Sequence, residues 1–389
     1  TPIQKNLPSE NEDYKKVSFV EALKISKWGI SLFLKNEPVQ MSINIVTSVL
    51  GATKEIIYTI IFAKTLDQLI KIIQEPNVDI SSMYRYLAIL LGYSVFESVL
   101  SYFKGRSYRT LRTKSRLFLR REMYLKLKNL GIQTLEEPEV NNKIFRSNDY
   151  IHNILPYVDQ SVSLLSSVIK TATAAVLVAG FMPLFILIFI AISLPYLFID
   201  KKFRREIYKL SYENTEKRRI SGAASWELTD ARSLQEISVI GAFKYMDDKF
   251  KIFTNWLINK ELNMDKKSRL SWHSFNLISD ITIFFGYIQI FNRFIISKLT
   301  IGDVTFWMKS LNILESTITN TITNFNDMSE SAMQIKDVYL LFQTNPIFPD
   351  GEKLLENMKS GPSIEFENVS FKYPNTDRFV IKNLNLEIK

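Results

Sequence analysis

Apolar positions along the chain gather in long stretches, and the strongest of these covers residues 171–199 without a charged side chain. As one helix these 29 residues would measure about 44 Å, which exceeds the roughly 30 Å of a bilayer's hydrocarbon core. Gly180 and Pro183 lie inside the stretch, where a tight turn would divide it. The pattern therefore predicts two consecutive membrane-crossing helices, over 152–179 and 184–200.

Four further apolar stretches contain a few polar side chains each, and they predict membrane-crossing helices over 38–62, 82–104, 272–297 and 303–328. The predicted fold class is an all-α membrane protein with six transmembrane helices. Charged side chains at membrane depth are unfavourable unless they face water or a partner, so their number predicts a bundle around a polar cavity. These residues are Lys54, Glu55, Glu97, Asp159, Lys170, Asp280, Arg293, Lys309 and Glu315.

Positive charges are concentrated in the two longest connections. Residues 104–128 contain ten cations and one acid, and residues 201–219 contain eight cations and three acids. Because positive charge marks the cytoplasmic side of membrane helices, both connections and both termini are predicted to lie in the cytoplasm. A basic helix that binds nucleic acid is an alternative interpretation, but it leaves the uncharged stretch unexplained.

Each of these connections has the pattern of a helix, a short break and a second helix. In the first, Gly131 and Pro138 interrupt the helical pattern, and in the second the interruptions fall near Gly222 and Asp230. The sequence therefore predicts two long helical hairpins that reach away from the membrane.

The two ends of the chain differ from its middle. After a tail over 1–17, residues 18–36 place lysines between apolar side chains at near-helical spacing, which predicts an amphipathic helix along the inner headgroups, with Trp28 at the interface. A core helix of a soluble domain would look similar. The six-helix domain covers 37–343 and a linker covers 344–362. Residues 363–389 have the alternating pattern of two strands, too few to bury a core of their own.

Composition narrows the possible chemistry. The 389 residues include no Cys and only two His, at positions 152 and 273, which excludes disulfide scaffolds and thiolate metal sites and leaves no His cluster for catalysis. Lys and Arg exceed Asp and Glu by 49 − 40 = 9. This excess suits the cytoplasmic flanks of membrane helices. We predict no metal site and no nucleic-acid partner.

The order of these elements, together with the terminal sequence IEFENVSFKYPNTDRFVIKNLNLEIK, resembles the ABC exporters of the half-transporter type, whose membrane domain has the type I fold. The resemblance covers nearly the whole chain but only the opening of the nucleotide-binding domain. In that family a strand ending in Val-Ser-Phe-x-Tyr-Pro opens this domain, and its aromatic residue stacks on adenine. The resemblance therefore implies adenine stacking for Tyr373.

Two short phrases in the cytoplasmic connections add to the resemblance. Residues 135–140 look like the first coupling region of peptide exporters, and residues 228–237 look like the second. In the family these tips seat in grooves of the nucleotide-binding domains. The resemblance implies coupling roles for Glu137, Pro138, Glu139, Thr229, Asp230 and Arg232.

No phosphate loop of the G-x-x-x-x-G-K-[ST] type occurs in the 389 residues. The chain is therefore expected to be truncated at the start of the nucleotide-binding domain and to contain no catalytic residue. The resemblance implies that the intact protein is an ATP-hydrolysing translocase that uses ATP and Mg²⁺.

The coupling phrases look closest to exporters of lantibiotics and related bacteriocins. They imply a peptide cargo moved out of a bacterium across its plasma membrane, a homodimer with a second copy of the chain, contacts with membrane lipid, and peptide-modifying enzymes as further partners. A lipid or drug exporter of the same architecture is the nearest alternative. A six-span membrane receptor with a cytoplasmic output domain is an alternative of another class.

Five charged residues are the candidates for the lining of the predicted cavity. They would attract cationic or zwitterionic cargo if they face inward, or they would pair with neighbouring charges and hold the bundle together. These candidates are Glu97, Asp159, Lys170, Asp280 and Glu315.

Overall fold

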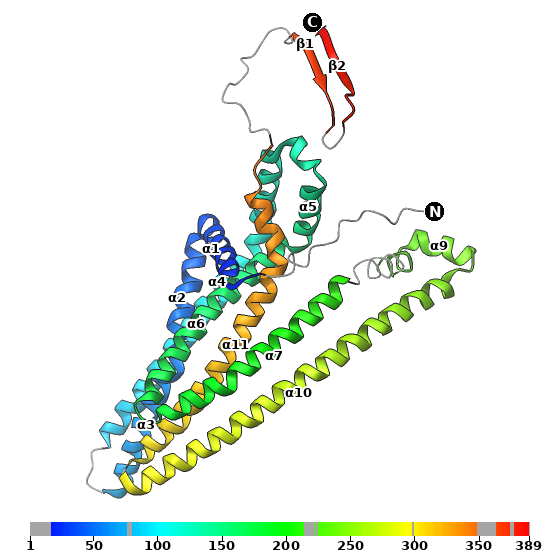
Figure 1. Ribbon diagram of the computed structural model, residues 1–389. Coiled ribbons are helices and arrows are strands. Elements are labelled where there is room, and N and C mark those ends of the chain that lie inside the picture. The colour runs from blue at the N-terminus through cyan, green and yellow to red at the C-terminus, as the bar shows by residue number, and fades with distance from the viewer. Residues whose placement is uncertain are drawn as a thin grey trace.

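The computed structural model describes residues 17–75, 80–213, 222, 225–297, 299–347, 363–373 and 377–388. Within them the chain is almost entirely helical (Figure 1). The helices are α1 (Phe19–Asn36), α2 (Pro38–Gly51), α3 (Lys54–Gln74), α4 (Ser81–Leu135), α5 (Pro138–Tyr150), α6 (Ile154–Ala179), α7 (Pro183–Glu213), α9 (Ala231–Val239), α10 (Phe243–Ser297) and α11 (Ile301–Gln343). The remaining elements are the 3-10 turn η2 (Ile151–Asn153) and two strands, β1 (Ile364–Phe371) and β2 (Ile381–Ile388).

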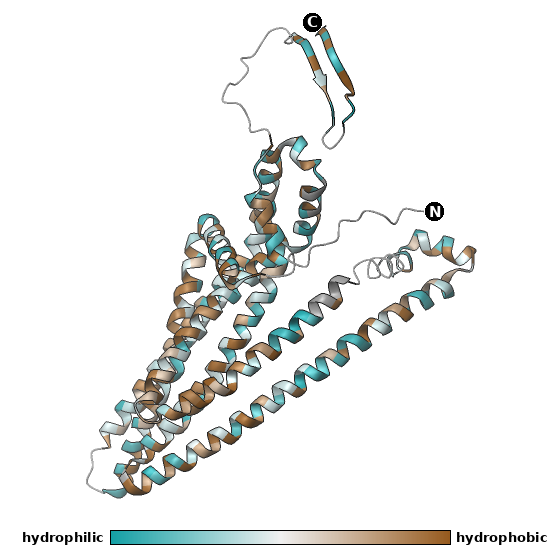
Figure 2. Cartoon of the chain, in the orientation of Figure 1, coloured by the Kyte–Doolittle hydropathy of each residue, from teal (hydrophilic) through white to brown (hydrophobic). Residues whose placement is uncertain are grey.

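The helices form an elongated bundle that opens toward one end. Figure 1 shows α7 and α10 running side by side and separating from α4, α5 and α11 toward the upper end of the view. The last turns of α3, α6 and α10 lie at the lower end. In Figure 2 hydrophobic residues gather toward this lower end, and hydrophilic residues are more frequent along the upper parts of α7 and α10. The pair α7 and α10 and the group α4, α5 and α11 therefore extend in the same direction, away from the apolar lower end of the bundle.

Five helical stretches of the described chain are long and apolar enough to cross a membrane. They are Pro38–Gln74, Ser81–Leu135, Lys143–Ala179, Pro183–Glu206 and Phe243–Ile296. The predicted sixth span, over 303–328, lies in α11, which is a single helix of 43 residues that packs against α3, α5, α6, α7 and α10. Its apolarity alone does not mark it as a membrane span.

Two boundaries differ from the predicted ones. The first predicted span, over 38–62, is two helices rather than one, because the helix is interrupted at Ala52 and Thr53. The second of these helices, α3, continues past the predicted end of the span to Gln74. The predicted interruption at Gly131 is confirmed within the long helix α4, where this residue has a φ of 73°. Gly adopts this left-handed region without steric cost.

Helix α1 is attached to the bundle along one face. Ala22, Ile25 and Phe33 of this face are buried completely or nearly so. Tyr157 of α6, which is itself buried, donates a hydrogen bond to the carbonyl of Ala22 (2.6 Å). The opposite face exposes apolar and basic side chains together, namely Val20, Leu23, Lys24 and Lys27. Helix α1 therefore has two different faces, and its buried face packs against protein.

Trp28 of α1 belongs to the packed side of the helix rather than to its exposed face. Its ring lies 5.5 Å from that of Tyr339 and 5.3 Å from that of Phe342, both in α11. Aromatic pairs at these separations stabilise a contact beyond the area they bury. Trp28 thus fixes α1 to the arm that α11 extends toward the upper end.

The hydrophobic core is divided between the two ends of the bundle. One cluster joins α1, α2, α4, α5, α6 and α11 around Phe33 and Tyr157. A second joins α3, α6, α7, α10 and α11 around Phe189 and Leu311, and a third, smaller cluster joins α7, α10 and α11. Helices α6 and α11 contribute to both of the larger clusters, so these two helices connect the ends of the molecule.

The carboxylate of Asp67 holds α3 against the start of α11 at the lower end. It accepts hydrogen bonds from the backbone N–H of Gly302 (2.6 Å) and from the Thr300 hydroxyl (2.8 Å). A Cβ atom at Gly302 would meet this carboxylate at 2.3 Å, so only glycine permits the approach. The negative charge also suits a helix N-terminus, where backbone N–H groups lack partners.

A second contact at the lower end joins the α6–α7 turn to α10 and α11. Phe181 stacks on Trp307 with ring centroids 4.2 Å apart. The guanidinium of Arg293 lies 4.4 Å from the centre of the Phe181 ring and donates a hydrogen bond to the Phe181 carbonyl (2.9 Å). The intramembrane cation predicted at Arg293 therefore has both an aromatic and a backbone partner.

The two strands pair antiparallel, with Phe366 opposite Leu386 and irregularities on either side of Val369. Both strands are largely exposed, as expected for a hairpin without further strands to cover it. Strand formation in this region is confirmed. Most of the predicted tail (1–17) and most of the predicted linker (344–362) lie outside the described residues.

We predict that Gly286→Ala lowers the thermal stability of the purified protein, because the added Cβ would meet Leu311 at 2.3 Å and Phe185 at 3.2 Å. Overpacking of this kind costs about 1–3 kcal/mol. Gly92→Ala is the matched control, since nothing lies within 4 Å of its Cβ position and alanine favours a helix. Unfolding midpoints in detergent check both variants. Equal midpoints for the two would contradict this packing of α10 on α11.

Candidate functional site

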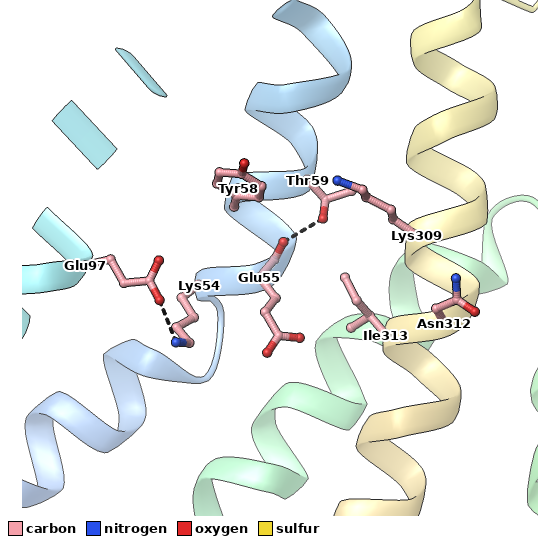
Figure 3. A pocket seen from close by; sticks show the side chains of 8 residues that line it. All are labelled: Lys54, Glu55, Tyr58, Thr59, Glu97, Lys309, Asn312 and Ile313. Carbon is pink, nitrogen blue, oxygen red and sulfur yellow. Dashed lines mark hydrogen bonds and ion pairs between the residues drawn. The ribbon is translucent and has the colours of Figure 1, made fainter. Parts of the chain in front are cut away.

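Three adjoining cavities form a polar tract between α2, α3, α4, α6 and α11. Their volumes are about 340, 160 and 240 Å³. Lys54 and Glu97 line both the first and the second cavity, and Lys104 and Ser166 line both the second and the third. Figure 3 shows the first cavity, with Lys54 and Glu97 facing each other and Lys309 projecting from the opposite helix. Four of the five helices around the tract, α2, α3, α4 and α6, belong to stretches that are long and apolar enough to cross a membrane.

Two ion pairs cross the polar tract. Lys54 Nζ lies 2.6 Å from Glu97 Oε1 of α4, and Lys170 Nζ of α6 lies 2.7 Å from Glu55 Oε1. Lys54 and Glu55 are consecutive, and successive residues of a helix point about 100° apart. They can therefore reach partners on two different helices. The two pairs together connect α3 to α4 and to α6.

The break between α2 and α3 makes this arrangement possible. It starts a new helix at Lys54, so that Glu55 lies in a first helical turn, where negative charge is favourable. The carbonyl of Lys54 accepts a hydrogen bond from the Tyr93 hydroxyl of α4 (2.8 Å). This bond gives the Lys54 carbonyl a partner close to the point where the helical hydrogen bonds are interrupted between α2 and α3.

Two further cations line the polar tract. Lys309 lies 4.0 Å from the ring centre of Phe62, and Lys104 lines the second and third cavities. The lining of the three cavities holds four lysines and two glutamates, a difference of 4 − 2 = 2 positive charges. The tract therefore presents an excess of positive charge.

The candidate cavity residues separate into two groups. Glu97 and Lys170 line the polar tract, each with an ion-pair partner. Asp159 accepts a hydrogen bond from Asn44 (3.3 Å), Glu315 accepts one from Thr319 (3.2 Å), and Asp280 is exposed on α10. These last three residues do not line the three cavities.

Sequence reasoning missed a charged cluster between α7 and α11. Arg204 contacts three carboxylates: Asp200 at 2.8 Å, Glu330 at 3.2 Å, and Asp327. Asp200, which is 8% exposed, also accepts a hydrogen bond from Asn326 (2.7 Å). The spacing of Asp200 and Arg204, four residues apart on one helix, was the only signal of the pairing in the sequence. Its partners on α11 require the fold.

The first predicted coupling tip lies between α4 and α5. Glu137 has an extended backbone and precedes α5, which begins with Pro138 at its first position. Proline there loses no helical hydrogen bond. The side chains of Pro138 and Glu139 lie outside the described residues. Thr134 accepts a hydrogen bond from the backbone N–H of Ile347 (2.9 Å), so this tip touches the chain that leaves α11.

The second predicted coupling tip is the turn before α9. The Asp230 carboxylate caps α9 by accepting a hydrogen bond from the N–H of Ser233 (3.0 Å), and this bond holds the pKa of Asp230 below its ordinary value. Thr229 donates to the carbonyl of Trp226 (2.9 Å), and Arg232 is exposed in the first turn of α9. Trp226 is 69% exposed. An exposed tryptophan beside a rigid helix cap suits contact with another domain.

Tyr373 follows β1, and its side chain is 59% exposed. Phe371 meets its ring edge-on, with centroids 5.2 Å apart. An exposed aromatic ring of this kind fits the requirement for base stacking. Among the described residues no group of three or more His, Asp or Glu side chains is placed to hold a metal ion.

Comparison with known proteins gives one distant relative. Over 366 residues, or 92% of this chain, the sequence is 22% identical to the subtilin transport ATP-binding protein SpaT of Bacillus subtilis. The chain spans 56% of the length of that protein. No protein-family model matches the chain.

This similarity extends over almost the whole chain, including its apolar helices. Together with five helices long enough to cross a membrane, it fits an ABC exporter. The same observations indicate a multi-pass membrane protein.

We predict that Lys170 and Glu55 are energetically coupled. Removing either partner alone, as Lys170→Ala or Glu55→Ala, leaves a charge among apolar helices, whereas removing both leaves none. A double-mutant cycle on the unfolding midpoint in detergent is therefore expected to give a coupling of about 1 kcal/mol. Lys251 and Asp247, an exposed pair within α10, provide the control, with a coupling of about 0.3–0.5 kcal/mol. A Lys170–Glu55 coupling no larger than the control would be evidence against the tract.

We predict that the α9 cap persists throughout neutral and mildly acidic pH. Because the folded pKa of Asp230 is lowered, its stabilisation is complete above the unfolded value of about 3.9 and is lost only as pH falls through the folded value. Asp230→Ala is expected to increase amide exchange at Ser233, and Asp230→Asn is expected to preserve protection because asparagine also caps helices. Hydrogen exchange measured at pH 7 and pH 5 checks this. Faster exchange at pH 5 than the intrinsic rate predicts would contradict it.

Proposed function

We propose that this chain is the membrane domain of an ATP-driven exporter with six transmembrane helices, and that the polar tract is part of its transport pathway. The observation that carries the proposal is the tract itself. Four lysines and two glutamates line adjoining cavities between α11 and helices that are apolar enough to cross a membrane. Such charges are costly in a bilayer unless they pair or meet a polar solute. A route for polar cargo accounts for their retention.

The sixth span in this proposal is α11. It begins beside Asp67 at the lower end and continues through the bundle. Its polar side chains have partners within the protein: Thr321 bonds Thr171 (2.9 Å), and Asn324 donates to Ser167 (2.6 Å). A helix satisfied in this way can cross a membrane despite modest hydropathy.

The structure suits an alternating-access mechanism with the cytoplasmic side open. At the lower end, Asp67 contacts the start of α11, and Arg293 of α10 donates a hydrogen bond to the α6–α7 turn. Toward the opposite end α7 and α10 separate from the other helices (Figure 1). We infer that the lower end is extracellular and that outward release requires its contacts to break. Both termini are then cytoplasmic.

We propose a peptide cargo of the lantibiotic or bacteriocin kind, exported from a bacterium across its plasma membrane. The relative's name records transport of subtilin, which supports a peptide over a lipid or a drug. The excess positive charge of the tract favours carboxylates on the cargo segment that occupies it. The sequence alone instead predicts that acidic residues attract a cationic or zwitterionic cargo. We propose the opposite charge on the cargo segment, because the two glutamates of the tract, Glu55 and Glu97, already form ion pairs with lysines.

ATP and Mg²⁺ would act in the nucleotide-binding domain. Of the described residues, Tyr373 would offer a ring face to adenine. The 389 residues contain no phosphate loop of the G-x-x-x-x-G-K-[ST] type. The tips at Glu137–Glu139 and Thr229–Arg232 would transmit closure of two such domains to the spans. We propose a homodimer, with lipid and peptide-modifying enzymes as further partners.

We predict that the full-length protein, reconstituted in vesicles, hydrolyses ATP faster when its peptide cargo is present. Lys309→Met removes from the tract a cation that has no carboxylate partner among the described residues. This change is expected to raise the peptide concentration for half-maximal stimulation about fivefold. Lys266→Met on the exposed part of α10 removes the same charge elsewhere and serves as the control. If lipids or drugs stimulate ATP hydrolysis and a panel of acidic and basic peptides does not, the protein is a lipid or drug exporter rather than a peptide exporter.

We also predict that Tyr373→Ala raises the KM for ATP severalfold in the full-length protein, since base stacking contributes about 1–3 kcal/mol. Tyr373→Phe retains a ring and is expected to leave the KM nearly unchanged. Steady-state ATPase assays measure both. Equal KM values for the alanine and phenylalanine variants would remove Tyr373 from the nucleotide site.

A further inference from the structure

A fourth cavity, of about 690 Å³, lies outside the polar tract, between α4 and the start of α6. Three arginines of α4 line it at intervals of four residues, Arg112, Arg116 and Arg120, so that their guanidinium groups follow one another along one helix face. His152 faces them from η2, with its Nε2 3.3 Å from an Arg120 nitrogen. Leu155 and Pro156 form part of the opposite wall.

Within the described part of the chain, no ion pair neutralises the arginines of this cavity. No acidic residue lines it, and none of the three arginines has a carboxylate partner among the residues that the structure describes. Three cations one helical turn apart repel each other. All three arginines are exposed to solvent and line the same cavity. This arrangement suits an anion that bonds several guanidinium groups together, and phosphate is one of the groups whose geometry the arginine fork matches.

The position of the cavity relative to the membrane surface indicates a lipid as the source of the phosphate. Helix α1 exposes Phe19, Val20 and Leu23 beside two lysines, the mixture that lies stably at the headgroup boundary of a membrane. The turns of α4 that carry the three arginines are fixed to the end of α1. Lys114 forms an ion pair with Glu37 (2.7 Å), and the rings of Phe118 and Phe33 are 5.1 Å apart.

We propose that the cavity of Arg112, Arg116 and Arg120 binds the phosphate headgroup of an anionic phospholipid from the inner leaflet. The arginines hold the phosphate, and the Leu155 and Pro156 wall receives the apolar part next to it. The bound lipid connects α4 to the start of α6, and so stabilises the arm that leads to the first tip. The proposal requires the helices to cross a membrane, and it does not depend on the nature of the cargo.

The test measures lipid binding to the full-length protein, delipidated and then given phosphatidylglycerol or phosphatidylcholine, by native mass spectrometry. We expect phosphatidylglycerol to bind and phosphatidylcholine to bind at least about tenfold more weakly. The triple change Arg112→Gln, Arg116→Gln and Arg120→Gln is expected to weaken phosphatidylglycerol binding about a hundredfold, since each cation contributes roughly a factor of five. The matched control changes three cations of α4 that do not line the cavity, Arg109→Gln, Arg121→Gln and Lys128→Gln, and is expected to change it less than about threefold.

Two further measurements keep the proposal falsifiable if the triple variant folds poorly. The triple arginine-to-lysine variant retains charge and is expected to bind phosphatidylglycerol more weakly than the wild type because it lacks the planar fork. A photoreactive residue at Pro156 of the otherwise unchanged protein is expected to cross-link phosphatidylglycerol. Equal binding of the two lipids, or equal loss in the control, would overturn the proposal. Inorganic phosphate or an acidic peptide that occupies the cavity while phosphatidylglycerol does not would overturn it in favour of a soluble ligand.

Discussion

The constraint on which this structure depends is that a charge among apolar helices needs a partner on another helix. Lys54 reaches Glu97 on α4, and the next residue, Glu55, reaches Lys170 on α6. Because the partners lie on different helices, each pair fixes how the helices are rotated as well as how far apart they lie. A bundle held by dispersion alone would tolerate many rotations. The ion pairs select one, and they create a polar space between the helices in doing so.

The same principle explains how the two ends of the molecule differ. At the lower end the charged groups have fixed partners across helices: Asp67 caps α11, and Arg293 contacts the α6–α7 turn. Arg204 joins α7 to α11 through three carboxylates, whereas α7 and α10 separate from the other helices toward the upper end of the view (Figure 1). The Arg204 cluster is therefore a further charged contact that holds α7 against α11.

Local features of the fold were predictable from the sequence because their causes are local. Gly180 and Pro183 determine the turn between α6 and α7, and Gly131 determines a break that only a few residues adopt without strain. Partner choice was not predictable, since it depends on the rotation of whole helices. Asp159 illustrates this: the sequence suggests either an inward-facing charge or a pair with a neighbouring charge, whereas in the structure its carboxylate accepts a hydrogen bond from the neutral side chain of Asn44. The break after α2 was missed although Gly51 ends this helix, because a single glycine inside an apolar stretch is tolerated in a helix and does not by itself predict a break.

Helix α11 shows why hydropathy and membrane position can diverge. The outer helices meet lipid and must be apolar on that face, so their sequences reveal them. Helix α11 is surrounded by α3, α5, α6, α7 and α10, and its polar side chains bond to other helices, as Asn324 does to Ser167. Protein neighbours replace lipid around it, which removes the need for apolar residues. Helix α11, whose apolarity alone does not mark it as a span, is therefore a helix enclosed by many of the others. It is also the helix that presents Lys309 to the polar tract.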